Sequence, residues 1–352
     1  MGYPVVCFLV LEYGSSFLLL NGWFNMSVGI LIFFVSFLLT FAVFPKVIPR
    51  LKKARIVGKD LNKPGQPEVA EMGGLVMVAG FAGGVIMSIA IETFFDRVVN
   101  LNLVVIFAIL STVLMIALIG IIDDLIFLPK SIKAITPIFA SFPLVAIRAG
   151  HTAMNIPFVG VIDFGLLYPL VLVPVGITGA ANAVNMLAGF NGLEVGMGIV
   201  AVGCLSVIAY FIGATTSFIV LISALGALLA TLRYNWYPAK VLIGDVGTLS
   251  IGAIIASAVI TGNFELAGVI IIIPYFIDFL FKALNHFPSK GWGGVYKNGK
   301  LYCPPSGPVS LCQFIMRLSK GISERALSLT LILIELGFGI VAILFYIKVL
   351  RL

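Results

Sequence analysis

The sequence predicts an all-α polytopic membrane protein, and three observations carry that prediction. Hydrophobic residues make up 61% of the 352 residues and charged residues only 11%, whereas soluble domains typically contain about 25% charged residues. The mean hydropathy of +1.16 excludes an intrinsically disordered chain and a small disulfide-stabilised scaffold. The third observation is a series of apolar runs that reach the roughly 20 residues needed to span a membrane.

We expect about ten spans, and the run 103–122 is the clearest because it carries no charge. Residues 1–26 contain two short apolar patches and form an uncertain N-terminal extension, whereas residues 27–352 form a single transmembrane catalytic domain. A short extracytoplasmic β-hairpin is expected near 152–163. The expected spans are Ser27–Pro49, Met72–Phe95, Leu103–Ile122, Ala134–Ala149, Leu166–Val184, Val195–Gly213, Ser217–Leu232, Val246–Thr261, Phe264–Leu284 and Ala326–Val349.

The basic residues are distributed unevenly between the two sides of such a bundle. Eighteen of the 22 lysines and arginines lie in, or next to, the loops that follow the odd-numbered spans. Loops rich in lysine and arginine face the cytoplasm, so the net charge of +7 marks the cytoplasmic side and does not indicate a nucleic-acid partner.

Two adjacent acids, Asp123 and Asp124, end the uncharged run 103–122. Two carboxylates about 4 Å apart repel each other by about 4 kcal/mol at an effective dielectric of 20, so a cation is expected beside them. Lys133 follows nine residues after Asp124. A single Asp would more often be a solvated helix end, but a pair followed by a lysine favours a functional site.

Asparagine and glycine are concentrated between residues 182 and 194. Asn182 and Asn185 are three residues apart and so share one face of a helix, and asparagine is costly in lipid unless it is paired. Gly189 allows a backbone to approach a ligand closely, and Asn191 follows it. An asparagine-rich turn is the alternative, and we favour a binding site.

Other cytoplasmic loops contain polar residues that membrane anchoring does not require. Attraction to anionic headgroups explains the basic run 46–55.

Asp245 lies between two glycines, which is a weak signal alone because Gly-Asp is ordinary turn chemistry. The remaining candidates for substrate binding are Asn62, Lys63, Glu71 and Lys290, together with His286 at the start of the last loop.

These loops together contain oxygen ligands for a metal, without paired histidines or cysteines in metal spacing. Such a set favours Mg²⁺, or Mn²⁺, over zinc. A hard cation, lysines and glycine-exposed backbone are the components of phosphoryl transfer. Because the site would lie at the membrane face, we expect one water-soluble substrate and one lipid substrate.

Several motifs, in this order, resemble the polyprenyl-phosphate N-acetylhexosamine-1-phosphate transferase superfamily (glycosyltransferase family 4) over about residues 27–349. They are D-L-N-K at 60–63, E-M-G-G at 71–74, D-D at 123–124, N-A-V-N-x-x-A-G-x-N-G-L-E at 182–194 and G-D-V-G at 244–247. Ala188 resembles the eukaryotic and archaeal branch, because bacterial members usually have Asp there.

The resemblance implies transfer of GlcNAc-1-phosphate from UDP-GlcNAc to dolichyl phosphate, which gives a diphosphate-linked lipid and UMP as the first step of lipid-linked oligosaccharide assembly. A homodimer is also expected. The resemblance implies that Asp245 binds the metal, with Asn185 and Asp123 nearby, and that Asp123 and Asp124 bind metal or activate the acceptor. It also implies that Lys133 contacts phosphate and that His286 contacts the diphosphate. Gly189 and Asn191 are implied to bind uracil.

Two positions depart from the eukaryotic pattern. Asn285 and Phe287 stand where arginines flank the histidine, and Leu242 stands where an aromatic residue stacks on uracil. Lys290 would supply the missing charge.

Four alternatives stay open at this stage. The donor could be another UDP-N-acetylhexosamine, for cell-wall or surface glycan synthesis. A multi-pass transporter would need ionisable residues near mid-membrane, for which Glu335 is the main candidate. An intramembrane aspartyl protease is partly matched by Gly244-Asp245, but Ile243 replaces its usual glycine. Transfer itself could be direct, or could pass through a phospho-aspartate on Asp123 or Asp124.

Overall fold

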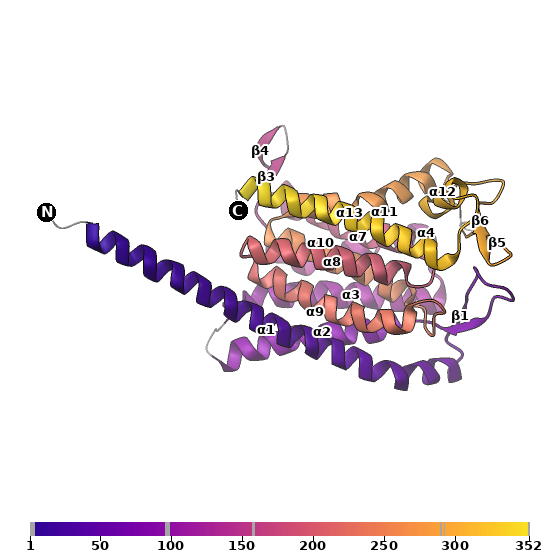
Figure 1. Ribbon diagram of the computed structural model, residues 1–352, viewed down its shortest axis with the longest axis horizontal. Helices are drawn as coiled ribbons and strands as arrows, with labels where there is room; N and C mark the ends of the chain where they lie inside the picture. Colours follow the sequence, from indigo (N-terminus) through magenta and orange to yellow (C-terminus); the bar gives the residue numbers. More distant parts are fainter. Residues whose placement is uncertain (1–3, 96–98, 157–158, 289–290, 292, 351–352) are drawn as a thin grey trace.

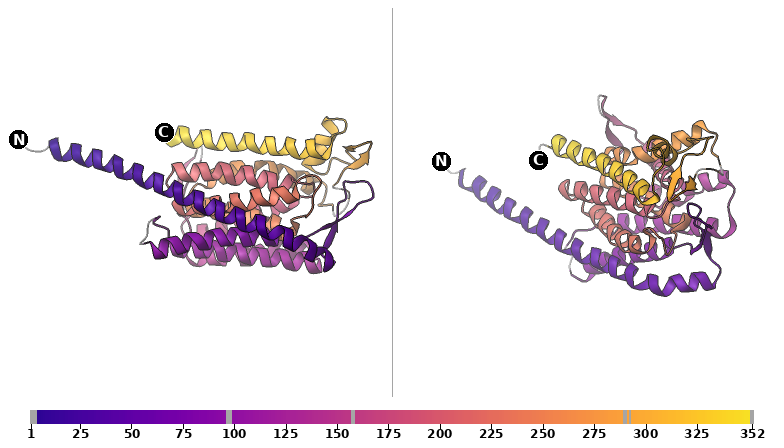
Figure 2. Two further views of the ribbon diagram at one scale, coloured as in Figure 1. Left: turned by 60° about the horizontal axis from the view of Figure 1, so that its bottom comes forward. Right: turned by 45° about the vertical axis from the view of Figure 1, so that its right-hand side comes forward.

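The computed structural model describes residues 4–95, 99–156, 159–288, 291 and 293–350. Within these residues, nine helices are long and apolar enough to cross a membrane, and they lie side by side as a bundle (Figures 1 and 2). The fold class predicted from the sequence is confirmed. The helices are α1 (Pro4–Lys53), α2 (Gly74–Phe94), α3 (Leu103–Ile126), α7 (Val173–Met186) preceded by the π-helical turn η1 (Tyr168–Leu172), α8 (Leu193–Phe211), α9 (Thr215–Asn235), α10 (Gly244–Gly262), α11 (Glu265–Leu284) and α13 (Glu324–Leu350).

The span expected at Ala134–Ala149 is not one helix. The structure divides it into α4 (Lys130–Ile135), α5 (Pro137–Ala140) and α6 (Phe142–Ala146). Pro137 and Pro143 lie in the first turns of α5 and α6, and a proline removes a helix hydrogen bond and clashes with the preceding turn. The three short helices still lie alongside α7, because α4, α5 and α6 all contact α7 and α6 also contacts η1.

Helix α10 forms the centre of the bundle and packs against α2, α3, α7, α8, α9 and α11. Small residues permit this close packing, as is usual where helices meet in membranes. A Cβ atom added to Gly252 would lie 2.3 Å from the carbonyl oxygen of Ala180 on α7, and one added to Gly120 on α3 would lie 2.4 Å from the Cα of Val246. The first turn of α10 is therefore held against α3.

Three antiparallel hairpins lie in the loops. The pair β3 (Ala153–Ile156) and β4 (Gly160–Asp163) confirms the hairpin expected near 152–163. The sequence did not predict β1 (Val57–Lys59) with β2 (Glu68–Ala70), or β5 (Val295–Lys297) with β6 (Lys300–Tyr302). These two hairpins and the short helix α12 (Leu311–Leu318) lie at the opposite end of the bundle from β3 and β4 (Figure 1).

Helix α1 continues back to Pro4 and so includes most of the segment that the sequence left unassigned. Its N-terminal part extends beyond the other helices (Figures 1 and 2).

Candidate active site

A lysine lies between two aspartates at the end of the bundle that carries β1, β2, β5 and β6. Lys133 Nζ on α4 is 2.7 Å from Asp123 Oδ2 on α3, and it also pairs with Asp245 Oδ2 on α10. Burial opposes the charge of Lys133, but Asp245 and Asp123 outweigh that effect and raise the pKa of the lysine. The ammonium group is therefore charged at neutral pH, and it is shared by the two carboxylates, of which it offsets one negative charge.

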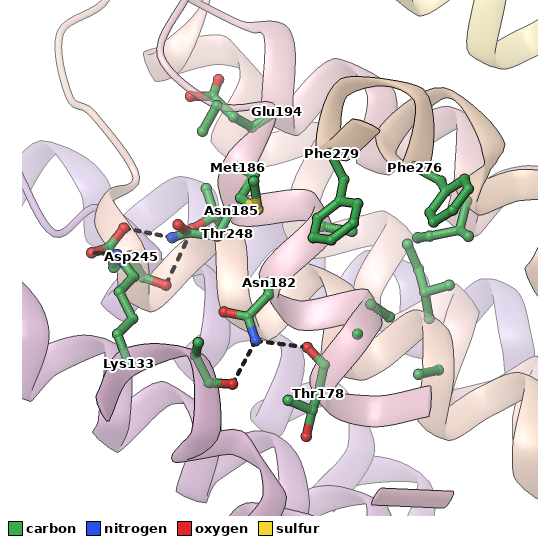
Figure 3. A pocket seen from close by; sticks show the side chains of 18 of the residues that line it. Lys133, Thr178, Asn182, Asn185, Met186, Glu194, Asp245, Thr248, Phe276 and Phe279 are labelled. Carbon is green, nitrogen blue, oxygen red and sulfur yellow. Dashed lines mark hydrogen bonds and ion pairs between the residues drawn. The ribbon is translucent and has the colours of Figure 1, made fainter. Parts of the chain in front are cut away.

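Helix α7 adds an amide to this cluster. Asn185 Nδ2 donates to Asp245 Oδ1 at 2.5 Å and to Thr248 Oγ1 at 2.8 Å (Figure 3). Thr248 was not singled out from the sequence. Its position three residues after Asp245 places both side chains on one face of α10, and that spacing could have identified it.

Asp124 is turned away from this cluster toward the backbone of α10. Its Oδ1 accepts the N–H of Asp245 at 2.8 Å, and its Oδ2 accepts the N–H of Val246 at 3.2 Å. Free N–H groups at a helix N-terminus favour a carboxylate in this way. The structure therefore shows Asp124 as a group that fixes the position of Asp245.

The oxygens of the acidic cluster suit a small hard cation. Among the described residues, no group of three or more His, Cys, Asp or Glu side chains could hold a metal. Mg²⁺, however, is usually bound by only one or two carboxylates, with substrate phosphates and water completing its shell. Asp123 and Asp245 supply two carboxylates and Thr248 a hydroxyl, so these residues fit Mg²⁺. Asn185 would add its amide oxygen after a turn of the amide, because its nitrogen faces Asp245 in this structure.

A second polar cluster joins three loops next to the first. Lys63 Nζ donates to Asn191 Oδ1 at 2.6 Å and to Glu324 Oε2 at 3.1 Å, and it also pairs with Asp60. Asn191 Nδ2 donates to Asp60 Oδ2 at 3.1 Å. Lys63 and Asn191 thus connect the first loop, the loop before α8 and the start of α13. Glu324 had no recognisable signal in the sequence.

Gly189 holds the loop between α7 and α8 through both of its backbone groups. Its N–H donates to Glu194 Oε1 at 2.8 Å, and its carbonyl accepts Asn62 Nδ2 at 2.9 Å. The φ angle of Gly189 is +121°, a conformation that favours glycine. Asn62 and Gly189, expected to bind substrate, therefore lie together and shape the same loop.

The other predicted residues have different surroundings. Asn182 Nδ2 donates to the carbonyls of Ala134 at 3.0 Å and Thr178 at 2.9 Å, and so ties α4 to α7. Glu71 lines the same cavity as Asp245, and its pKa is raised by burial and by the charge of Asp245.

In the last loop, His286 is exposed, and its neighbours Phe287 and Pro288 line the cavity. Lys290 lies outside the described residues.

One cavity of about 1340 Å³ joins the acidic cluster to an apolar region. Asp245, Asn185 and Lys133 lie at its polar end, and Phe276 and Phe279 of α11 line its apolar part (Figure 3).

Lys282, which sequence reasoning missed, also lines this cavity. Its ammonium pairs with Asp278 at 2.9 Å and donates to the carbonyl of Met186. Opposite charges four residues apart in an apolar span were the signal that could have revealed this pair.

Comparison with known proteins identifies relatives along most of the chain. Residues 106–263 match the family described as glycosyl transferase family 4. A Saccharolobus solfataricus protein is 36% identical over 312 residues, which is 88% of this chain and 94% of the relative, and carries the provisional name UDP-N-acetylglucosamine–dolichyl-phosphate N-acetylglucosaminephosphotransferase. The Dictyostelium discoideum protein of the same name, without that qualification, is 26% identical over 376 residues, covering 91% of this chain and 88% of the relative.

A bacterial relative is also similar. The phospho-N-acetylmuramoyl-pentapeptide-transferase of Clostridium perfringens is 30% identical over 257 residues, which is 70% of this chain and 79% of the relative. The resemblance inferred from the motifs is confirmed, and this multi-pass membrane protein belongs to glycosyl transferase family 4.

Proposed function

We propose that this chain transfers GlcNAc-1-phosphate from UDP-GlcNAc to a polyprenyl phosphate such as dolichyl phosphate, giving a GlcNAc-diphospho-lipid and UMP. The observation that carries the proposal is the single cavity that contains both Asp245 and the apolar walls of α7, α10 and α11. A reaction between a nucleotide sugar and a lipid phosphate needs a charged and an apolar environment in one continuous space. The archaeal and Dictyostelium relatives carry names that describe this reaction.

The apolar part of the cavity is open along its side. Val175 on α7 is 59% exposed, and Val269 and Phe276 on α11 are 56% and 51% exposed, although all three line the cavity. Exposed apolar side chains in the middle of a membrane-spanning bundle face lipid. This opening supports a lipid tail as the occupant of the apolar part, and we call this part the groove.

In the proposed reaction, an oxygen of the lipid phosphate bonds to the phosphorus that carries the sugar. The bond from that phosphorus to the bridging oxygen breaks, and its electron pair leaves with UMP. Asp245, Asn185 and Asp123 would hold Mg²⁺ or Mn²⁺, which supplies charge neutralisation at the diphosphate. When the cation takes over Asp123 and Asp245, the ammonium that now pairs with both acids would be free to contact phosphate oxygens.

Direct transfer fits these residues better than a phospho-enzyme on Asp124. Both carboxylate oxygens of Asp124 accept backbone N–H groups of α10, which reduces their nucleophilicity. A lipid phosphate is ionised near neutral pH and needs no strong general base. A phospho-aspartate on Asp123 is the remaining form of the two-step alternative.

We further propose that the site faces the cytoplasm. The hairpins β1–β2 and β5–β6 lie at one end of the bundle (Figure 1), and Lys59 of β1 lines the same cavity as Asp245. The segments 46–71 and 282–325, which include these hairpins and the adjoining helix ends, contain 14 of the 22 basic residues. Basic loops are retained on the cytoplasmic side.

The proposal is tested by UMP release from UDP-GlcNAc with purified protein, lipid phosphate and Mg²⁺. We expect release to require all three and to fall to the level without enzyme in Asp245→Ala. Asp163→Ala is the control, because Asp163 lies on the distant hairpin strand β4, and it should leave the rate unchanged. Activity that survives in Asp245→Ala would show that the site is assigned wrongly.

A panel of UDP-N-acetylhexosamines, with mass analysis of the lipid product, identifies the donor. A product formed only with a different sugar would replace UDP-GlcNAc and support the alternative of cell-wall or surface glycan synthesis.

A further inference from the structure

The groove continues from the acidic cluster to the opposite end of the bundle. There it is lined by Met154 of β3, by Tyr168 of η1 and by Glu265 of α11. The Tyr168 hydroxyl donates a hydrogen bond to the Glu265 carboxylate. Because η1 leads into α7 and Glu265 begins α11, this bond joins the two walls of the groove at its far end.

The lining residues show that the groove follows one face of each helix. On α11 they recur every three or four residues, which is the spacing of one helical face. Asp245 and Ile260 line the two ends of α10, and fifteen residues of helix correspond to about 22 Å at 1.5 Å per residue. The residues of α11 that line the cavity are Glu265, Gly268, Val269, Ile272, Phe276, Phe279 and, at the polar end, Lys282.

Tyr168 is held firmly in this position. Its side chain is 2% exposed, and its hydroxyl lies so close to Gly150 that a Cβ atom there would be only 2.6 Å away. The Glu265 carboxylate beside it is polar, and covering it with hydrocarbon would carry a desolvation cost. The end of the groove is therefore closed both by the ring of Tyr168 and by a group that an apolar chain avoids.

We propose that the Tyr168–Glu265 pair limits the length of acceptor tail that the groove holds. Beyond that length, a longer tail no longer increases kcat/KM. This inference rests on the proposed function, because the tail is that of the lipid phosphate accepted near Asp245. Each added isoprene unit contributes burial until the tail reaches Tyr168. A longer tail turns sideways between Val175 and Val269 into the bilayer.

The first test compares geranyl, farnesyl, geranylgeranyl and longer polyprenyl phosphates as acceptors. For the unmodified protein, kcat/KM should rise with tail length and then become constant. Gly179 lines the groove and has nothing within 4 Å of an added Cβ atom, so the leucine side chain of Gly179→Leu would enter the groove. In Gly179→Leu the constant region should begin at a shorter tail, and KM for long acceptors should rise at least about tenfold.

Gly337→Leu is the matched control. Gly337 is also helical and exposed, with nothing within 4 Å of an added Cβ atom, but it lies on α13. Its length profile should equal that of the unmodified protein. A Gly179→Leu variant that loses activity equally with all acceptors, including geranyl phosphate, would contradict a tail in the groove.

The second test opens the far end. Tyr168→Ala removes the ring and should move the start of the constant region to longer tails, whereas Tyr168→Phe keeps the ring and should leave it in place. Glu265→Ala provides an independent opening variant should Tyr168→Ala fail to fold, as judged by thermal melting. An unchanged profile in folded opening variants would overturn the role of this pair.

The two proposals fail in different ways. No lipid product with any acceptor would count against the proposed function. Lipid product with equal kcat/KM at every tail length would count only against the length limit.

Discussion

The Lys133 ammonium lies between the carboxylates of Asp123 and Asp245, a position to which a divalent cation would also be attracted. The lysine pairs with both acids, and both belong to the oxygen set that fits Mg²⁺. A metal that binds Asp245 must therefore compete with this lysine. The lysine would be released to contact a phosphate only when the cation takes over its partners.

Removing the ammonium should thus improve metal binding while harming transfer. In Lys133→Met we expect Mn²⁺ to bind at least about tenfold more tightly without substrate, because the two facing carboxylates lose the ammonium that pairs with both of them. Electron paramagnetic resonance titration of the detergent-solubilised protein measures this affinity. The control is Lys130→Met, because Lys130 donates to the carbonyl of Phe287 instead. Equal Mn²⁺ affinity in Lys133→Met and the unmodified protein would refute the competition.

Glu71 provides a pH-dependent measurement at the same end of the cavity. Burial and the charge of Asp245 raise its pKa above the ordinary value of 4.5. The unfolded chain therefore ionises Glu71 at lower pH than the folded protein, so the free energy of unfolding falls as pH rises from 4.5 through the raised pKa. Glu71→Gln lacks this titration. Melting curves should show the unmodified protein losing stability relative to Glu71→Gln over that interval, and a constant difference would contradict the raised pKa.

At the scale of elements, α10 depends on a cap that another helix supplies. The carboxylate of Asp124 on α3 accepts the first N–H groups of α10, and Gly120 lets the two helices approach closely. The position of Asp245 is thus fixed by α3 as well as by its own helix. The two adjacent acids of α3 therefore have different roles: Asp123 pairs with Lys133, whereas Asp124 orients the N-terminus of α10.

Helix α13 carries a buried acid that the proposed reaction does not use. Glu335 is fully buried, and within the described part of the chain neither of its side-chain oxygens has a hydrogen-bond partner. An unsatisfied buried polar group costs about 1–3 kcal/mol, so Glu335→Met should raise the free energy of unfolding by that order without loss of transfer. Thermal or chemical denaturation in detergent checks the change. A destabilised Glu335→Met would indicate a partner for this carboxyl group.

The sequence predicted the helices and the acidic cluster better than the links between loops. Asp123, Asp124, Asn185 and Asp245 stand out because acids and amides are costly at the ends of apolar runs. Asn191 was expected to bind uracil, a role that stays a prediction, and the structure shows that its side chain is already engaged with Lys63 and Asp60. Glu324 approaches Lys63 across 261 positions, and no local pattern encodes such a contact.

Single helices were also harder to predict where proline interrupts them. Ala134–Ala149 has the apolar composition of a span, but Pro137 and Pro143 divide it into short pieces. The apolar composition predicted a membrane span here. The interruption of the helix depends on the backbone geometry of proline, which hydropathy does not measure.

For the whole molecule, the two ends of the bundle should lie on opposite sides of the membrane. The hairpin β3–β4 lies at one end, and β1 and β5–β6 lie at the other (Figure 1), where Lys59 of β1 lines the same cavity as Asp245. This arrangement agrees with the distribution of basic residues. The homodimer expected from the family resemblance stays a prediction.

Cysteine labelling tests that orientation directly. Val161 on β4 and Tyr296 on β5 are 73% and 43% exposed, so a cysteine at either position should be accessible from its own side. With Cys7→Ser and Cys303→Ser as background, a membrane-impermeant maleimide should label Val161→Cys in intact cells and Tyr296→Cys only after the membrane is opened. The reverse pattern would place the site on the outer face.

The sideways opening of the groove has a kinetic consequence for the whole enzyme. An acceptor whose tail enters between α7 and α11 meets the protein by diffusing within the plane of the bilayer. The turnover rate would then follow the mole fraction of lipid phosphate in the membrane, and its total concentration in the sample would matter only through that fraction. Adding inert phospholipid at a fixed amount of acceptor should therefore slow the reaction, as surface dilution slows an enzyme that works in two dimensions.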